Sequence, residues 1–382
     1  GNGGNGAIGT DGLLPIPGGQ AVLKQAVGKL GGLTGSVKEY KDLTVAVGGT
    51  GGATGDGGTV EVNNNKNITT HGVSSNGILA QSIGGGGGVG GVAAIGALGK
   101  LGLGGEGGAA GDGKLVTVNQ YGGATIETFG IASNGIFAQS VGGGGGVAGN
   151  VNRILANKKS VAGVDLPALN LGAGLALGRS GGKGGDGGTV DVDVDGQIIT
   201  HGDSAAGIFA QSVGGGGGVL GELGNDLPVL SLLSWQIGSA GDAGNAGLVD
   251  VDLTGNIVTT GNNATGIFAQ SAGGTGMAGA VDVVVDGSIL TGQVLEAGDE
   301  NRGLGSTGIL AQSAATNNAN NGDITVAIDS ADGVVLGGRS LVIDADRAYT
   351  GVGIWVMDGK NNSVTNNGLV TTLGGVMEGY AI

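Results

Sequence analysis

The chain has 382 residues, of which 95 are glycine, and its formal net charge is −15. This charge disfavours nucleic acid or anionic lipid as a partner, because binding to phosphates depends on Lys and Arg. The sequence contains no cysteine, which excludes disulfides, thiolate catalysis and zinc–thiolate sites. Apolar residues make up 39% of the chain, and many are Val and Ile at a spacing of two, so the composition favours strands over disorder.

The first segment, residues 1–47, is predicted to be a lead-in to the repeats. Ala21 to Leu30 follow two prolines and place their apolar residues on one face, which predicts a short helix. Leu43 to Val47 then predict a strand that leads into the repeats. No apolar run in the sequence reaches the 18 residues or so that a membrane-spanning helix needs.

A heptad that ends in Gln-Ser recurs five times and dominates the middle of the chain. Its fullest copy, at 207–213, reads Gly-Ile-Phe-Ala-Gln-Ser-Val and is followed by five glycines. A second block precedes the copies and consists of a Val-x-Val strand, a turn and an Ile-x-Thr strand, as at 187–202. Three short strands and three turns in roughly 25 residues predict one coil of a parallel β-solenoid. The other copies of the heptad lie at 77–83, 135–141, 266–272 and 308–313.

Apolar inserts of variable length separate each glycine run from the next Val-x-Val block. The inserts at 89–112, 147–186 and 219–246 are predicted to fold back and cover part of the outer face of the solenoid. The glycine runs are predicted to form corners, because a residue without Cβ permits positive φ and close approach of successive coils. Insert-decorated coils are therefore expected over residues 48–313.

The inserts disappear from residue 314 onward, and residues 314–382 predict plain coils of the same column. With adjacent strands ~4.8 Å apart, on the order of a dozen coils would form a rod roughly 60 Å long. The predicted fold is therefore all-β: a right-handed parallel β-helix with Gly-rich corners and lateral insertions. Both alternating sets of side chains in the heptad contain apolar residues, so its sequence leaves open which set faces the interior.

Four aspartates are candidates for calcium binding. Asp191, Asp193 and Asp195 alternate with valine as at the start of a calcium loop, and Asp186 ends a block similar to half of a calcium-binding nonapeptide. The alternation buries the valines and places the carboxylates on the wet face of one strand. The default interpretation is therefore a solvated acidic face, although a divalent ion between stacked carboxylates would be physically sensible.

No motif predicts catalysis or a cofactor. His71 and His201 occupy a place that Phe129 and Thr260 fill in other copies, which is typical of an outward turn residue. The repeated serines have no His partner in the pattern, which argues against a nucleophile, and no Lys-Ser/Thr pair follows the glycine runs. The repeated glutamines would form an amide ladder only if their coils were adjacent. We therefore expect that the protein is not an enzyme.

The combination of G-[IL]-[FL]-A-Q-S-[IV] and a glycine run with G-G-[DE]-G-G-x-V-x-V and I-x-T-x-G resembles the Gly-rich passenger regions of large bacterial autotransporters (type V secretion). The resemblance covers about residues 48–313. It implies an extracellular β-helix made within a longer precursor that has a signal peptide and a C-terminal outer-membrane barrel. Neither segment is recognisable here, so we expect a processed or excised piece that meets the outer membrane only through the missing barrel.

The resemblance implies a structural or adhesive rod on the bacterial cell surface that contributes to adhesion, self-association or a surface fibre. Its expected partners are other copies, neighbouring cell-surface components or surface glycans. One alternative is a carbohydrate-active enzyme on a β-helix scaffold, which would need a carboxylate cluster that breaks the repeat. Another is a lateral calcium- or ice-binding rod, although Thr70, Thr128, Thr200 and Thr260 occur singly in their coils.

Overall fold

The computed structural model describes residues 49–90, 106–146, 148, 180–217, 241–293, 303–340 and 350–373, and the backbone of several short strands outside these ranges. The predicted helix at 21–30 lies outside the described residues. No helix among the described residues is long and apolar enough to cross a membrane.

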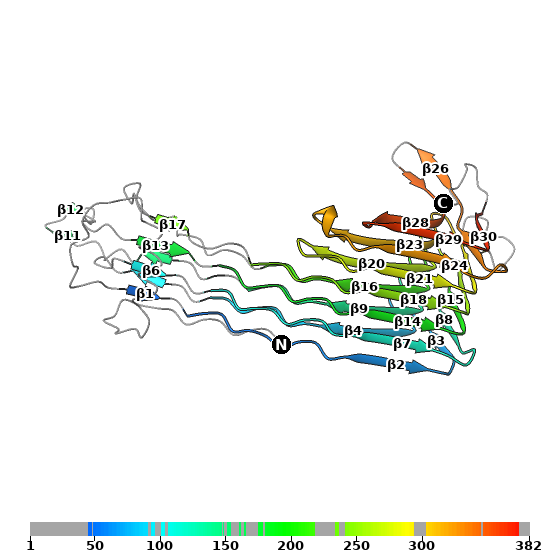
Figure 1. Ribbon diagram of the computed structural model, residues 1–382, viewed down its shortest axis with the longest axis horizontal. Helices are drawn as coiled ribbons and strands as arrows, with labels where there is room; N and C mark the ends of the chain where they lie inside the picture. Colours follow the sequence, from blue (N-terminus) through cyan, green and yellow to red (C-terminus); the bar gives the residue numbers. More distant parts are fainter. Residues whose placement is uncertain are drawn as a thin grey trace.

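Three parallel sheets stack their strands along one axis and form a β-solenoid, which confirms the predicted all-β parallel fold (Figure 1). Each of the first six coils contributes one strand to each sheet, and the last described coil contributes strands only to sheets 1 and 2. Sheet 1 contains β2 (Val60–Asn64), β7 (Val116–Gln120), β14 (Val190–Val194), β18 (Val249–Leu253), β21 (Val281–Val285), β24 (Ile324–Ile328) and β29 (Asn362–Asn366). Sheet 2 contains β3 (Ile68–Thr70), β8 (Thr125–Thr128), β15 (Gln197–Thr200), β19 (Asn256–Thr259), β22 (Ser288–Thr291), β25 (Val334–Gly337) and β30 (Leu369–Thr372). Sheet 3 contains β4 (Ile78–Ile83), β9 (Ile136–Val141), β16 (Ile208–Val213), β20 (Ile267–Gly274), β23 (Thr307–Ala315) and β28 (Val352–Asp358).

The remaining strands lie outside the three sheets. A four-stranded parallel sheet joins β1 (Val45–Val47), β6 (Leu101–Leu103), β13 (Leu175–Gly178) and β17 (Ser234–Gln236). Three strand pairs are β5 (Ala93–Ile95) with β10 (Val151–Arg153), β11 (Ser160–Val161) with β12 (Val164–Asp165), and β26 (Leu341–Asp344) with β27 (Arg347–Tyr349). A short 3-10 helix spans Asn318–Asn320.

The core is a column of small and β-branched side chains that stack on their counterparts in the next coil. Ile208 pairs with Ile136 on one side and Ile267 on the other, and all three are fully buried. The inward set of the heptad is thus Ile, Ala and Ser, and its outward set begins with Phe209 and Gln211. The alternation of β14 is also confirmed, because its three valines are buried and its two aspartates face outward.

Sheets 1 and 2 each hold seven strands, so the described solenoid has seven coils rather than about a dozen. The coils are fewer because successive heptads are direct neighbours in sheet 3. The inserts between the heptads therefore add length to existing coils and do not form additional coils. At ~4.8 Å per coil, this column is roughly 30 Å tall rather than roughly 60 Å.

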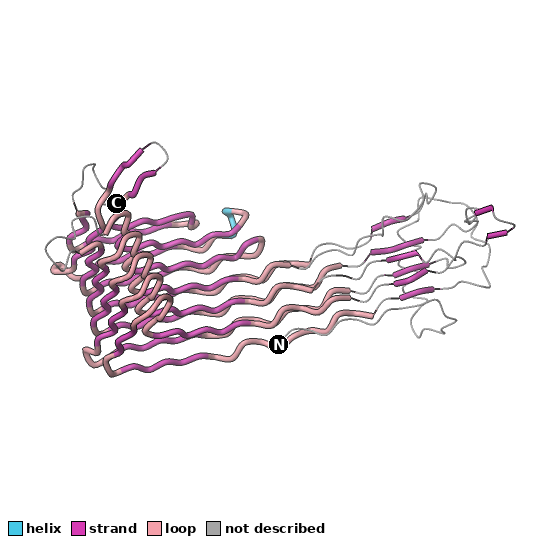
Figure 2. Tube along the Cα trace, turned by 180° about the vertical axis from the view of Figure 1, so that it is seen from behind, coloured by secondary structure: helices cyan, strands magenta, loops and turns pink. Residues whose placement is uncertain are grey.

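The glycine runs form straight arms rather than corners, which corrects that prediction (Figures 1 and 2). The outgoing arms, residues 84–88, 142–146 and 214–217, continue directly from strands of sheet 3. The return arms, residues 50–58, 106–113 and 180–188, lead back to sheet 1. No glycine in these described segments has a positive φ, so unusual backbone angles are not the reason for glycine here.

The hydrogen bonds of the arms repeat every three residues. In one return arm, the Gly107 N–H donates to the next coil at 3.1 Å and the Gly108 N–H donates to an outgoing arm at 2.8 Å. Ala110 and Gly111 repeat these two bonds, each at 2.9 Å. A repeat of three is that of a polyproline II helix, whereas a strand repeats every two residues. Each arm is thus bonded both to the adjacent coil and to the arm that runs beside it.

Close approach of the arms of successive coils explains glycines along both layers. A Cβ added to Gly108 would overlap the carbonyl oxygen of Gly52, and one added to Gly143 would overlap that of Gly85. Backbone atoms cannot move aside without breaking the hydrogen bonds that they make. The predicted role of glycine in close approach is therefore correct, but it acts along the arms.

The described strands of the inserts lie at the far end of the arms, away from the three sheets (Figure 1). There β1, β6, β13 and β17 pair in parallel and repeat the stacking order of the coils. The prediction that the inserts fold back over the outer face of the solenoid is therefore wrong for these strands. Backbone pairing between coils continues at both ends of the arms.

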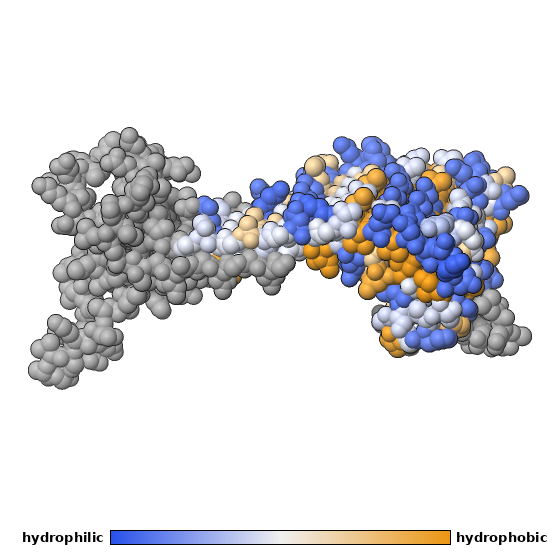
Figure 3. Space-filling view, turned by 90° about the horizontal axis from the view of Figure 1, so that it is seen from below, coloured by the Kyte–Doolittle hydropathy of each residue, from blue (hydrophilic) through white to orange (hydrophobic). Residues whose placement is uncertain are grey.

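The two ends of the described column differ in chemistry. Seen from the β2 end, apolar side chains of the interior are exposed to solvent (Figure 3). Val60, Val62 and Ile68 of the first coil are only half-buried. In the last coil, by contrast, Asn362 and Asn366 pair with Ile324 and Ile328, so polar residues occupy these two inward positions.

Two neighbouring glycines provide a matched test of the arms. We expect Gly143→Ala to lower the free energy of unfolding by about 2 kcal/mol, because its Cβ would overlap a backbone carbonyl. Gly144→Ala should change it by less than about 0.5 kcal/mol, since no heavy atom lies within 4 Å of its Cβ position. Urea denaturation of both variants checks this, and equal effects would contradict the close approach of the outgoing arms of successive coils.

Candidate functional site

The outward side chains form continuous rows, because each coil pairs in register with the next. The glutamines of the heptads form one row on sheet 3, in which each Nε2 donates to the Oε1 of the next coil. The distance is 2.9 Å from Gln81 to Gln139 and 2.6 Å from Gln139 to Gln211. The ladder ends where Gln312 donates to the Asp358 carboxylate at 2.7 Å. The amide ladder that the sequence left open is therefore present.

An aromatic row runs beside the glutamine ladder. The rings of Phe137 and Phe209 stack with centroids 4.6 Å apart, and those of Phe209 and Phe268 with centroids 4.7 Å apart. The ring planes are nearly parallel, at 1° and 6°, so stacked neighbours cover the ring faces and leave the edges toward solvent. Sheet 3 therefore presents a flat outer face of amides, ring edges and aliphatic side chains.

The serine of each heptad faces inward and binds backbone rather than a reactive partner. Ser140 is fully buried, and its Oγ donates to the Lys114 carbonyl at 2.8 Å and accepts from the Gly188 N–H at 2.8 Å. Ser212 repeats this pattern one coil later. The hydroxyl thus replaces a ladder hydrogen bond where the return arm enters sheet 1, and no base approaches it. The threonines Thr128, Thr200 and Thr259 are likewise fully buried, and Thr259 rather than Thr260 continues their row.

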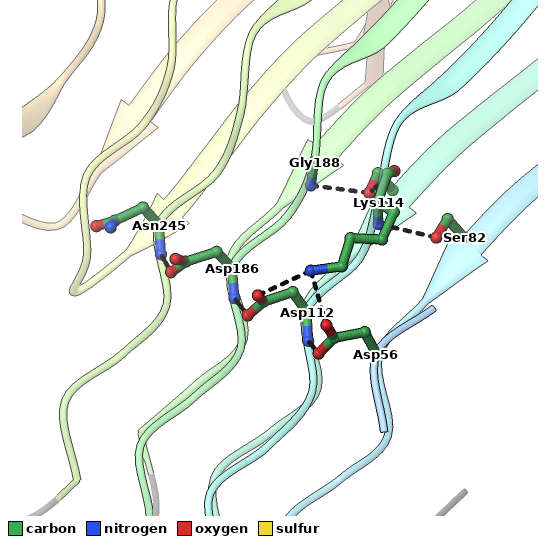
Figure 4. Close-up of polar contacts among 8 residues, drawn as sticks. Asp56, Ser82, Asp112, Lys114, Asp186, Gly188 and Asn245 are labelled. Carbon is green, nitrogen blue, oxygen red and sulfur yellow. Dashed lines mark hydrogen bonds and ion pairs between the residues drawn. The ribbon is translucent and has the colours of Figure 1, made fainter. Parts of the chain in front are cut away.

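A ladder of carboxylates holds the inner ends of the return arms (Figure 4). Asp56 Oδ1 accepts from the Asp112 N–H at 2.9 Å, and Asp112 Oδ1 accepts from the Asp186 N–H at 2.9 Å. Asp186 in turn accepts from the Asn245 N–H at 2.8 Å. The recurring Gly-Asp-Gly at the end of each return arm was the sequence signal for this ladder, which the sequence analysis missed.

One lysine forms ion pairs with the first two members of this ladder. Lys114 Nζ lies 2.8 Å from Asp56 Oδ2 and 3.1 Å from Asp112 Oδ2. The hydrogen bond from Lys114 lowers the pKa of the Asp56 carboxyl, and the bond to Asp56 raises the pKa of Lys114. These groups are largely exposed, so the ion pair positions the arms and contributes little to stability.

The four calcium candidates do not come together. Asp186 belongs to the arm ladder, and Asp195 is exposed on the turn after β14. Asp191 and Asp193 lie on the outer face of sheet 1, where they pair with Asp250 and Asp252 of the next coil. No group of three or more His, Cys, Asp or Glu suited to a metal ion occurs among the described residues. The carboxylates thus form an acidic face and not a compact cage.

Desolvation and mutual repulsion disfavour the charged form of these stacked carboxylates. Partial burial first, and then neighbouring carboxylates, raise the pKa of Asp250 to about 6. The same two causes raise the pKa values of Asp191 and Asp252 above their ordinary range. The folded chain therefore binds protons here more readily than the unfolded chain.

The two histidines lie at equivalent turns and belong to a stack of rings. Phe129 lies between them, with its ring centroid 4.7 Å from that of His71 and 4.4 Å from that of His201. His201 Nε2 also lies 2.9 Å from Glu127 Oε1. The stack supports the interpretation of this place as an outward turn position, and it shows that the rings pack on one another.

Comparison with protein-family models, curated proteins and solved structures finds no match for the chain.

The acidic face makes stability depend on pH. Because the pKa of Asp250 is raised in the folded chain, its contribution favours folding at low pH and is lost as pH rises through about 6. We therefore expect the melting temperature to rise when pH falls from 7.5 to 5. Asp250→Asn should stabilise the protein at pH 7.5 by about 1 kcal/mol, a value reduced from the full shift because solvent screens the carboxylate.

Calorimetry of Asp250→Asn at both pH values measures this effect. Asp195→Asn, which removes a carboxylate outside the stack, serves as the control and should leave stability at pH 7.5 nearly unchanged. A wild-type melting temperature that falls between pH 7.5 and pH 5, with no gain from Asp250→Asn, would contradict repulsion on this face.

Proposed function

We propose that the chain is an extracellular structural or adhesive β-solenoid on the bacterial cell surface, where it contributes to adhesion, self-association or a surface fibre. The observation that carries the proposal is the repetition of the outward side chains in rows along the coils. A partner meets a flat surface on which neighbouring coils repeat similar side chains. Such a surface suits extended or repeating partners, whereas small-molecule sites are concave and singular.

The side chains that chemistry would require are engaged within the fold, which supports a structural role. Ser212 and its equivalents bind backbone, and Thr128 is buried among the strands. His201 is packed against Phe129 and lies beside Glu127. The acidic side chains repeat along sheet 1 and do not form a localised pair that breaks the repeat. This arrangement favours a rod over a carbohydrate-active enzyme.

The cell-surface location rests on the sequence resemblance to autotransporter passenger regions and on the lack of cysteine, which suits an exported bacterial protein. The partners proposed are further copies of the chain and neighbouring cell-surface components, with surface glycans as another class. A column held by backbone hydrogen bonds between all its coils would present these surfaces on a stiff support.

Adhesion can be measured with beads that carry the purified chain. Beads coated with it should clump with one another, or bind to bacterial cells and to polysaccharide-coated plates, several-fold more than beads coated with an acidic globular protein. The reason is the multivalent presentation of the same flat faces.

Two controls separate the proposal from its alternatives. Antibodies against the chain should label intact cells of the bacterium that produces it, and the purified chain should release no sugars from the polysaccharides used. Beads that adhere no better than the control, together with release of sugars, would contradict the structural role and favour an enzyme.

A further inference from the structure

The outer face of sheet 3 is a candidate interaction surface that is distinct from the acidic face. We call the outward side chains of β4, β9, β16, β20 and β23 the glutamine face. Each strand contributes three outward residues, as Phe209, Gln211 and Val213 do in β16. Their counterparts in the neighbouring coils pair with them in register, so the face consists of an aromatic, an amide and an aliphatic row. At the β4 edge, Leu79 and Ile83 are 58% and 55% exposed.

The glutamine face carries no charge in a chain whose net charge is −15. The outer face of sheet 1, by contrast, concentrates aspartates whose pKa values are raised by partial burial and by repulsion from neighbouring carboxylates. Two copies that approached through sheet 1 would add to this repulsion. The glutamine face allows two acidic molecules of the same kind to meet without opposing carboxylates.

The glutamine ladder has hydrogen-bonding capacity left over. A primary amide has two N–H donors and a carbonyl oxygen with two lone pairs, and the ladder uses one donor and one lone pair of each inner glutamine. A partner that satisfies the rest needs donors and acceptors, as neutral amides provide, at the same ~4.8 Å spacing as the coils. A second copy of this chain provides that spacing and those amides.

The outgoing arms extend this face with bare backbone. Gly86, Gly144 and Gly216 lie in register, and their N–H groups have no hydrogen-bond partner among the described residues. No heavy atom lies within 4 Å of a Cβ built on Gly144 or Gly216, so the fold of one molecule does not require glycine there. Glycine at these places keeps the surface flat and leaves donors accessible to a close neighbour.

The area of the face is compatible with a reversible dimer. Five coils at ~4.8 Å and strands of six residues at ~3.3 Å give about 500 Å² for one copy, and thus about 1,000 Å² for two. This lies at the lower limit for specific interfaces, which is typical of weak, reversible association.

We propose that two copies of this chain pair through the glutamine face, in a two-fold arrangement that brings the two glutamine ladders together. This inference rests on the proposed function, because it names the surface and the partner of self-association. In a two-fold pair the same patch meets itself, and the central coil, β16, lies next to the axis. Gln211 of one copy then faces Gln211 of the other.

Sedimentation velocity of the purified full chain over a range of concentrations tests the pairing. The wild type should shift from monomer to dimer, and Val213→Lys and Gly216→Lys should each weaken the dimer by roughly tenfold or more, because they bury unpaired charges. Val258→Lys is the matched control, since Val258 faces outward on sheet 2. It should leave the dimer unchanged, and circular dichroism confirms that each variant is folded.

Cross-linking gives a second readout that does not depend on affinity. The chain contains no cysteine, so Gln211→Cys introduces a single thiol. Under mild oxidation, Gln211→Cys should form a disulfide-linked dimer, and Val258→Cys should not. Protection of the thiol of Gln211→Cys from alkylation in a monomer would instead assign the face to another segment of the same chain and overturn the pairing.

The outcome separates the pairing from the proposed function. A chain that stays monomeric at all concentrations overturns the pairing, and so does a dimer that Val213→Lys leaves intact. If beads coated with such a chain still adhere, the proposed function stands without this interface. A dimer that dissociates with Val213→Lys and Gly216→Lys but not with Val258→Lys supports the pairing, even if coated beads fail to adhere.

Discussion

Backbone hydrogen bonding between successive coils is the interaction on which the rest of the structure depends. In the three sheets it pairs each residue with its counterpart one coil away, so Ile stacks on Ile and Gln on Gln. In the arms the same coil-to-coil bonds recur every third residue, and a second set joins the outgoing and return layers. Where an arm meets a sheet, side chains supply further hydrogen bonds between coils. These side chains are the buried serines and the Asp56–Asp112–Asp186 ladder.

This constraint also determines the surfaces. A position that faces outward in one coil also faces outward in the next, so equivalent side chains form a row. Where two coils differ in sequence at such a position, the row changes its chemistry there. Favourable rows, such as the amides and stacked phenylalanines of sheet 3, gain from repetition. Rows of like charge are destabilised by repetition: partial burial and then repulsion between neighbouring carboxylates raise the pKa of Asp250. An uncharged face and an acidic face on one column give the molecule one surface suited to close contact and another that keeps copies apart.

The sequence predicted the parts of the fold that local pattern controls. Alternation of valine and aspartate in 190–194 identified the strand, its buried side and its wet side correctly. The sequence could not show which side of the heptad faces the interior, since Ile208 and Phe209 are both apolar. It also could not show the number of coils, because repetition does not reveal which copies are neighbours. The role of the glycine runs was also hidden, because five identical residues carry no period, and their three-residue pattern arises only from pairing with other arms. The surfaces were harder still, since Asp186 and Asp191 are close in sequence but belong to different ladders.

Amide hydrogen exchange along a return arm tests the central claim most directly. In residues 107–111, the N–H groups of Gly107, Gly108, Ala110 and Gly111 are bonded to other arms, and that of Ala109 has no partner among the described residues. We expect slow exchange at the four bonded positions and fast exchange at Ala109, in a pattern of period three. Fast exchange at all five positions, or a pattern of period two, would contradict the paired layers of arms and the continuous stacking of the coils.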